Sequence, residues 1–404
     1  ASQIASHAGG VNGSTALEAM FTGEFRDFPI RNDAGSSDTA AVVQKLKELL
    51  SNAAGDELDH VVLCNSGAEA NEVALRIASR QRPGRKKILS FEGAFHGRTM
   101  WALHSTWNPA KRLRFELEGF QACWVKWPRW DGSSPVLNDS HEVPESYFKP
   151  LGADARELDD TASELERLEF DSLIEVERAL EGDEIVAILI ECMQSEGGDR
   201  WATERFFCRL RALALAYEVP FIVDEVQTGF RLGGPFFWHS LYRLPAAPDL
   251  ISSAKKCQVG AVISRWALDV PDEVNVTSVV RGLAQARMVS EDEAKDYEVR
   301  MQAKLNELRD RFPEYVLAPR ACGYSFAFDL PTAEDMQHFI KERMWRGYMV
   351  YGAGNRTLRF RLNTEMTPLA LDALFERLAS SLTTLRAGAD PSWQRVSLPD
   401  QANP

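Results

Sequence analysis

Short, uninterrupted apolar runs recur along the chain, and they constrain the fold more than any other feature of the sequence. The first four are HVVLCN (60–65), KKILSF (86–91), EIVAILIE (184–191) and VPFIVDE (219–225). Strands without an apolar/polar alternation are buried on both faces, as in a parallel sheet that helices cover on both sides. Segments with helical spacing, such as ANEVALRIASRQR and RFFCRLRALALAYE, separate the runs. The sequence therefore predicts an α/β fold with a doubly wound, mainly parallel sheet.

The pattern changes from about residue 295. YEVRMQAKLNELRDRF predicts an amphipathic helix, and YSFAFDL, GYMVYG and TLRFRL predict short strands. We expect an N-terminal segment over 1–39 that belongs partly to a small domain, a large domain over 40–290, and a smaller C-terminal α+β domain over 291–404. Residues 150–184 are strongly acidic with Leu and Ile at helical spacing, which predicts a solvated amphipathic helix. The tail from residue 389 is expected to be irregular.

Charge and cysteine content narrow the classes of partner. The 404 residues carry a formal net charge of -13, which disfavours nucleic acid and favours small molecules. The six cysteines form no CxxC or CxxH cluster, so we expect reduced thiols and no metal site. ASQIASHAGG at the start lacks the basic flank and apolar stretch of a signal peptide, and no run reaches membrane-spanning length. We therefore expect a cytoplasmic protein.

Polar residues that follow the predicted strands are the candidate site, because ligands of parallel sheets bind at the carboxyl ends of the strands. Asp224 ends the fourth run and needs a partner there: a protonated ring nitrogen of a cofactor, an arginine or a backbone cap. CNSGAEANE places Ser66, Gly67 and Ala68 between a strand and a helix, where backbone N–H groups can bind a phosphate. An ordinary turn with a serine cap fits that stretch equally well.

Two further stretches add an aromatic pair and a lysine pair. Phe95 and His96 in GAFHG can pack in the core or lie against an aromatic ring. The short run in PDLISSAKKCQVG (248–260) ends in Lys255 and Lys256, and a lysine beside a buried strand is paired, extends to solvent or is used chemically. A phosphate cradle, a strand-end acid, an aromatic platform and a strand-end lysine are together the parts that hold pyridoxal 5'-phosphate (PLP).

Six motifs occur in the order found in the class III (omega-type) aminotransferases, which the chain resembles from about residue 40 to 390. They are NSGAEANE, GAFHGRT, MQSEGGDR, DEVQTG, PDLISSAKKCQVG and TLRFRL. The resemblance implies the PLP-dependent fold type I. Within the family, the L-lysine 6-aminotransferase subgroup is favoured by the motifs KKCQVG, EGGDR and WPRWD. The 4-aminobutyrate aminotransferase subgroup is similar at QSEGGD and FHGRTM. We expect transamination of the terminal amine of L-lysine to 2-oxoglutarate, which gives 2-aminoadipate 6-semialdehyde and glutamate.

The resemblance also implies how the cofactor is bound. Lys255 forms the Schiff base, and Lys256 is then structural, because adjacent side chains of an extended segment point to opposite faces. Asp224 pairs with the pyridine nitrogen. The remaining contacts implied are Gln227 on the ring hydroxyl, Val226 on one ring face, Phe95 or His96 on the other, and Ser66, Gly67 and Ala68 at the phosphate.

Substrate binding is assigned to arginines by the same resemblance, and the guanidinium group suits bidentate carboxylate recognition. Arg98 is similar to the residue that binds the distal carboxylate of the amine donor, and Arg359 to the one that binds the α-carboxylate of 2-oxoglutarate. Glu196 resembles the switch residue that pairs with that arginine while the donor is bound. Arg361 is expected only in a surface or interdomain ion pair. The family forms homodimers with shared active sites.

Two departures and several alternatives accompany this interpretation. The family has a longer N-terminal segment and an N-S-T-W-G type loop that clamps the phosphate, for which Thr277 is a poor match. We expect the natural protein to carry both, and an intact mass equal to 45.3 kDa would contradict this expectation. Alternatives are a 4-aminobutyrate donor, a racemase or aminomutase, and a noncatalytic scaffold. A nicotinamide dehydrogenase is disfavoured because GAGNRT (352–357) lacks the last glycine of GxGxxG.

Overall fold

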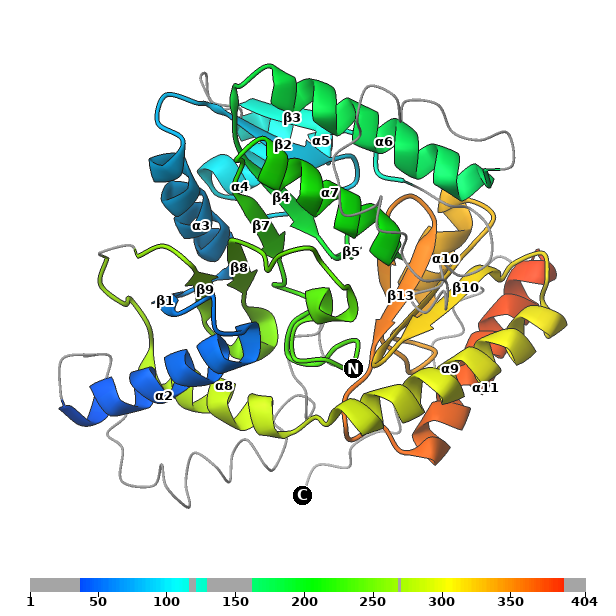
Figure 1. The fold of residues 1–404 in the computed structure, drawn as a ribbon. Helices are drawn as coiled ribbons and strands as arrows, with labels where there is room; N and C mark the ends of the chain where they lie inside the picture. Colours follow the sequence, from blue (N-terminus) through cyan, green and yellow to red (C-terminus); the bar gives the residue numbers. More distant parts are fainter. Residues whose placement is uncertain (1–36, 116–120, 129–161, 268–269, 389–404) are drawn as a thin grey trace.

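The computed structural model describes residues 37–115, 121–128, 162–267 and 270–388. Within them, a seven-stranded sheet and a four-stranded sheet lie side by side, with helices packed around both (Figure 1). The expected irregular tail, most of the segment 1–39 and the first part of the acidic stretch 150–184 lie outside the described residues.

The large sheet has the strand order β1-β9-β8-β7-β4-β2-β3. In that order the strands are β1 (His60–Cys64), β9 (Gly260–Ser264), β8 (Leu250–Ser253), β7 (Phe221–Asp224), β4 (Ile185–Glu191), β2 (Lys87–Phe91) and β3 (Gln121–Val125). The five strands from β8 to β3 pair in parallel, which confirms the mainly parallel sheet.

The edge of this sheet differs from the expectation, because β1 pairs with the antiparallel strand β9. Strand β9 follows β8 after a short turn, and strands joined by so short a connection can only pair antiparallel. It therefore separates β1 from the parallel strands. Since β9 runs against both neighbours, β1 and β8 run in the same direction, and their carboxyl ends meet at one edge of the sheet.

Helices cover both faces of the large sheet. All seven residues of β4 are buried: Ile188 and Ile190 pack into the cluster with α6 (Glu164–Glu181) and α7 (Glu204–Ala216), whereas Val186 and Leu189 pack into the cluster with α3 (Gly67–Gln81). This double burial explains the continuous apolar pattern of the run. The remaining helices of this part are α2 (Ser37–Ala54), α4 (Met100–His104), α5 (Pro109–Arg112) and α8 (Val276–Arg287).

Helix α6 is the described part of the predicted acidic helix. Ser163 and Glu166 close its N-terminus as a capping box, which satisfies two backbone N–H groups. The helix is less solvated than expected, because Glu169 is only 3% exposed. Its carboxylate accepts hydrogen bonds from Thr203 Oγ1 (2.5 Å) and Arg205 Nε (2.8 Å). These partners allow an acidic side chain to face the protein interior.

The small sheet has the antiparallel order β10-β11-β13-β12. Its strands are β10 (Leu317–Cys322), β11 (Ser325–Asp329), β13 (Thr357–Arg361) and β12 (Tyr351–Ala353), and its helices are α9 (Glu291–Arg311), α10 (Ala333–Glu342) and α11 (Pro368–Arg386). The strands expected in YSFAFDL and TLRFRL are confirmed. The one expected in GYMVYG begins only at Tyr351, because Gly347, at φ +70°, still belongs to the turn after α10.

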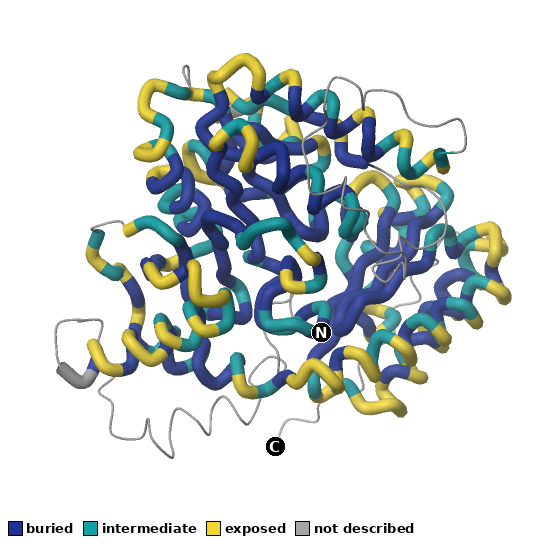
Figure 2. Tube along the Cα trace, in the orientation of Figure 1, coloured by how far each residue is buried: buried dark blue, intermediate teal, exposed yellow. Residues whose placement is uncertain are grey.

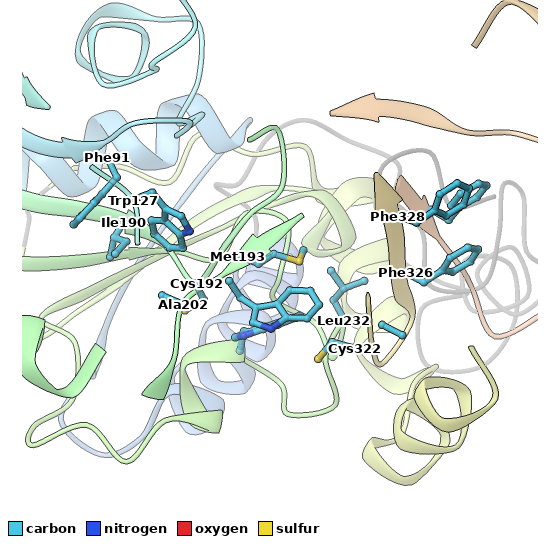
Figure 3. Packing of buried hydrophobic residues seen from close by; sticks show 14 of the residues in the cluster. Phe91, Trp127, Ile190, Cys192, Met193, Ala202, Leu232, Cys322, Phe326 and Phe328 are labelled. Carbon is cyan, nitrogen blue, oxygen red and sulfur yellow. The ribbon is translucent and has the colours of Figure 1, made fainter. Parts of the chain in front are cut away.

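One hydrophobic core joins the two sheets. Figure 3 shows its side chains from Phe91 in β2, through Met193 and Leu232, to Phe326 in β11. The burial pattern agrees, since the strands of both sheets are dark blue along most of their length (Figure 2). The domain boundary expected between residues 290 and 291 coincides with the start of α9, but the division into domains remains a prediction.

The described residues include no helix that combines the length and the apolar character needed to span a membrane. The same residues contain no group of three or more His, Cys, Asp or Glu side chains that could hold a metal ion. All six cysteines are free thiols.

Candidate active site

A cavity of about 510 Å³ lies where the chain leaves β1, β7 and β8, at the carboxyl ends that the sequence pointed to. Its wall brings together almost all of the predicted site residues. They are Ser66, Gly67, Ala68, Phe95, His96, Arg98, Glu196, Asp224, Val226, Gln227 and Lys255. Arg359 is the exception: it is 2% exposed and contacts Glu196 from behind the wall.

The N-terminus of α3 forms one end of this cavity. Ser66 is the N-cap residue, and its Oγ accepts a hydrogen bond from the backbone N–H of Glu69 (3.2 Å). A side chain on Gly67 would place Cβ 2.7 Å from Val226 Cγ1, and one on Gly260 would place it 2.3 Å from the Ser66 carbonyl oxygen. Glycine at both positions therefore lets this turn approach the strands closely. The first N–H groups of the helix lack intrahelical acceptors and attract an anion.

Asp224 is the most tightly held carboxylate of the cavity and is 4% exposed. Its Oδ2 accepts hydrogen bonds from Asn71 Nδ2 and His96 Nδ1 (2.8 Å each), and its Oδ1 accepts one from the Val226 backbone N–H (3.0 Å). Hydrogen bonds from three groups thus hold this buried carboxylate in one orientation. Of the two predicted ring-stacking residues, His96 is thus engaged with Asp224, whereas Phe95 remains available to a ring.

Lys255 lies on a 3₁₀ turn (Lys255–Cys257, η6), so the extended geometry expected for the lysine pair is wrong. Its φ of +54° is in the left-handed region, which costs about 1–2 kcal/mol for a residue with a side chain. Burial lowers the pKa of Lys255, and the positive charge of Arg359 adds to this effect, although Glu196 and Asp224 oppose it. A lysine with a lowered pKa has a larger share of neutral, nucleophilic amine.

The two adjacent lysines nevertheless separate as predicted. Lys256 points away from the cavity and donates a hydrogen bond from Nζ to the backbone carbonyl of Phe230 (2.9 Å). It is 3% exposed, and burial together with the charge of Arg361 lowers its pKa to about 7. The structure thus gives Lys256 a packing role.

Glu196 connects the cavity to Arg359. Its Oε1 accepts a hydrogen bond from Arg359 Nη2, and its Oε2 is 3.1 Å from Nζ of Lys111. Burial opposes ionisation of Glu196, but Arg359 and Lys111 outweigh it and lower the pKa to about 2. Two other donors of Arg359, Nε and Nη1, are buried and have no hydrogen-bond partner among the described residues. Unpaired buried donors of this kind can bind a carboxylate.

Arg361 forms a buried ion pair and is not on the surface. It extends from β13 of the small sheet, is 4% exposed, and contacts the Asp199 carboxylate through Nη1 (2.5 Å) and Nη2 (2.6 Å). Its Nε and Nη2 also donate to Gln227 Oε1, at 3.1 and 2.8 Å. Since a guanidinium can only donate, these bonds fix the amide oxygen of Gln227 and leave its NH₂ group for the cavity.

Sequence reasoning missed four residues of the site: Asn71, Lys111, Glu191 and Arg281. Two of them had a signal. Asn71 follows Gly67 by four residues, so both lie on one face of the helix. Glu191 ends the third apolar run as Asp224 ends the fourth, and burial followed by the charge of Asp224 raises its pKa well above the ordinary value. Lys111 and Arg281 lie in no motif.

The residues of this cavity fit PLP. The N-terminus of α3 suits the phosphate, Val226 and Phe95 offer apolar faces to a ring, and the Asp224 carboxyl group suits a protonated ring nitrogen. Lys255 has an amine of lowered pKa on the same wall. The residues therefore suit both ends and both faces of the cofactor.

Comparison with known proteins agrees with this chemistry. The family model described as "Aminotransferase class-III" matches residues 3–278. The L-lysine-epsilon aminotransferase of Mycobacterium tuberculosis is 28% identical over 94% of this chain and 85% of that protein. The 4-aminobutyrate aminotransferase of Saccharomyces cerevisiae is 27% identical, with 95% of this chain and 85% of that protein covered.

Solved structures share the architecture. "Lysine aminotransferase from M. tuberculosis in the internal aldimine form" superposes with a TM-score of 0.76 at 26% identity, and covers 95% of this chain and 89% of that one. The ornithine aminotransferase from Toxoplasma gondii superposes with a TM-score of 0.72 at 18% identity. The match covers 96% of this chain and 86% of that one, and so low an identity shows likeness of fold alone.

Proposed function

Because the chain belongs to the class III aminotransferases, we propose that it transfers the terminal amine of L-lysine to 2-oxoglutarate and releases 2-aminoadipate 6-semialdehyde and glutamate. It is a PLP-dependent enzyme of fold type I. The observation that carries the proposal is the arrangement of Lys255, Asp224 and the Glu196–Arg359 pair around one cavity. The lysine aminotransferases among the relatives support L-lysine as the donor.

The cofactor is proposed to lie with its phosphate at the N-terminus of α3. Ser66, Gly67 and Ala68 would hold the phosphate there, and Asp224 would keep the ring nitrogen protonated. Ring contacts are proposed for Phe95 and Val226, with the Gln227 NH₂ group on the ring hydroxyl and His96 as the partner of Asp224. When bound, PLP supplies the electron sink for the reaction and carries the amino group between the two substrates.

Lys255 is proposed to hold the cofactor through its amine and afterwards to move the proton. A donor amine that takes its place frees Nζ of Lys255 within the cavity. The lowered pKa increases the fraction of neutral amine at Nζ, and this amine can remove a proton from the donor carbon and return it to the cofactor side. Burial of Lys255 limits the access of water to this proton.

Arg98 and Arg359 are proposed to bind the carboxylates of the two substrates. With the amine donor bound, Glu196 neutralises Arg359, and the donor carboxylate binds at Arg98 on the exposed rim of the cavity. With 2-oxoglutarate bound, Arg359 binds the α-carboxylate and Glu196 gives up its contact. One cavity can thus accept two substrates of different length.

Arg98 provides a test of the donor assignment. Arg98→Met is expected to raise KM for L-lysine by about 10- to 100-fold with a smaller change in kcat, because a charge-assisted bond contributes about 1.5–3 kcal/mol to substrate binding. n-Pentylamine, which lacks the carboxylate, serves as the control donor and is expected to react equally with both enzymes. A loss that is equal for the two donors would contradict the assigned role.

4-Aminobutyrate is the second candidate donor, favoured by relatives of nearly the same identity. Both donors place a carboxylate at the far end of an amine, so Arg98 serves either one. The ratio of kcat/KM for the two donors, measured on the purified enzyme with 2-oxoglutarate, decides between them.

A second copy of the chain is the proposed macromolecular partner. Met100, Leu113 and Phe115 are 47%, 60% and 64% exposed and lie on the chain that follows Arg98, in α4 and in the turn η2 (Leu113–Phe115). Exposed apolar side chains gathered in one stretch are typical of protein interfaces. Sedimentation equilibrium is expected to give twice the chain mass. The six free thiols favour the cytoplasm as the compartment.

A further inference from the structure

Lys111 occupies a position beside the cavity that the proposed reaction does not yet use. It lies in α5, and its Nζ is 3.1 Å from Glu196 Oε2 and 4.5 Å from the ring centroid of Phe95. Both ionic side chains are partly buried, with 28% of Lys111 and 27% of Glu196 exposed. Lys111 lines a second cavity, of about 640 Å³, that shares Phe95 and Glu196 with the first.

Glu196 has two cationic partners on two different oxygens. Arg359 contacts Oε1 and Lys111 contacts Oε2. Removal of one partner from a buried ion pair is costly because it leaves the other charge uncompensated. Without Lys111, Glu196 would therefore hold Arg359 more firmly, since release would leave a partly buried carboxylate without a counter-charge.

We infer that Lys111 is a positioning residue of the second half-reaction, which holds Glu196 while Arg359 binds the α-carboxylate of the 2-oxo acid. This inference rests on the proposed roles of Glu196 and Arg359. Lys111 acts through Glu196, which it keeps neutralised after the contact with Arg359 is broken. The amine donor needs the Glu196–Arg359 pair intact, so its half-reaction does not depend on Lys111.

The contact with Phe95 gives Lys111 a second conceivable role, in holding the aromatic ring. A cation over a ring contributes about 0.5–2 kcal/mol. Loss of that contact would alter both half-reactions equally, because the same ring faces the cavity in each. Separate measurement of the half-reactions therefore distinguishes the two roles.

Lys111→Met removes the charge and keeps most of the side-chain volume. Stopped-flow absorbance on enzyme loaded with the aminated cofactor, pyridoxamine phosphate, is expected to show a loss of about tenfold in the rate with 2-oxoglutarate. This size lies between the effects of an exposed and of a buried ion pair. The rate with L-lysine is expected to stay within about twofold of the wild type. Lys111→Arg restores the charge and the 2-oxoglutarate rate. Lys126→Met, at a lysine of the second cavity that pairs with Glu175, is the matched control.

A binding experiment gives a second readout without turnover. Titration calorimetry with glutarate, a dicarboxylate that cannot react, is expected to show about tenfold weaker binding to the Lys111→Met variant. Pentanoate, with one carboxylate, is expected to bind both proteins equally. An unchanged glutarate affinity, or equal losses in the two half-reactions, would overturn the inference.

If the proposed function is wrong, the experiments give results that differ from those that would overturn the role of Lys111. If wild-type enzyme reacts with 4-aminobutyrate in place of L-lysine, the same half-reaction comparison is made with that donor. If it reacts with neither, the proposed function fails, and the glutarate titration still decides whether Lys111 frees Arg359.

Discussion

Lys255→Ala is expected to lower the rate of transamination with every amine donor by at least about 10³-fold, because general acid–base catalysis alone contributes about 10²–10⁴-fold. The variant loses both the covalent attachment of the cofactor and the amine that moves the proton. Its spectrum with PLP should lack the visible band of a lysine-bound cofactor. Added methylamine is expected to restore part of the rate, since a free amine can take the place of Nζ.

Lys256→Met is the matched control for this prediction. Lys256 does not line the cavity and donates instead to the Phe230 carbonyl, so its loss leaves a buried acceptor without that donor. We expect a decrease of about 1–3 kcal/mol in the free energy of unfolding. Activity per folded molecule should stay within a few-fold of the wild type. If Lys256→Met abolished the visible band and Lys255→Ala retained it, the assignment of the two lysines would be reversed.

Asp224→Asn is expected to slow both half-reactions by about 10- to 10³-fold. An adjacent carboxylate raises the pKa of a cationic group by about 1–3 units, and each unit is a factor of ten in the protonated fraction. An asparagine keeps the size of the side chain, and its one oxygen can still accept hydrogen bonds from Asn71 and His96, but its NH₂ group cannot accept the bond from the Val226 N–H. The rate loss therefore combines the missing charge with one lost hydrogen bond. A pH titration of the bound cofactor, followed by absorbance, should show the change in ring protonation directly.

Glu225→Gln controls for the removal of a neighbouring buried charge. Glu225 is completely buried, but its carboxylate accepts hydrogen bonds from the His239 backbone N–H (2.7 Å) and Thr228 Oγ1 (2.5 Å) and does not line the cavity. This variant is expected to be less stable with an unchanged titration of the cofactor. If Asp224→Asn and Glu225→Gln lowered the rate by the same factor, the loss would follow from removing any buried carboxylate in this region. The charge of Asp224 would then have no specific role.

The large sheet was predictable because its signal is local. Each buried strand reads as a continuous apolar run, and the polar residue that ends the run marks the edge where the cavity lies. Strand β9 escaped this reasoning, because only the pairing partners reveal that GAVIS turns back between β8 and β1. Strand β10 also escaped, since it includes Pro319 and Arg320. The arginine can be buried because it donates to backbone carbonyls, among them that of Asp199, and to the Asp329 carboxylate.

Motifs identified the parts of the site, but not how they are held. The choice of Lys255 over Lys256, which the resemblance implied, agrees with the cavity. The extended segment expected to separate the two side chains is instead a turn. The partners of Arg361 lie 162 and 134 residues away in the sequence, and the partner of Lys111 lies 85 away. No local pattern connects residues so far apart, so the second cation on Glu196 became visible only in the folded chain.

The central claim, that PLP bound at Lys255 takes the terminal amine of L-lysine, is tested most directly by one absorbance experiment. Purified protein is loaded with PLP, and the visible band of the lysine-bound cofactor is followed after addition of L-lysine or, separately, 4-aminobutyrate. The account predicts that L-lysine converts the band to the shorter-wavelength absorption of the aminated cofactor and that 2-oxoglutarate restores it. Conversion by 4-aminobutyrate and not by L-lysine, or folded protein that shows no band at all, would contradict it.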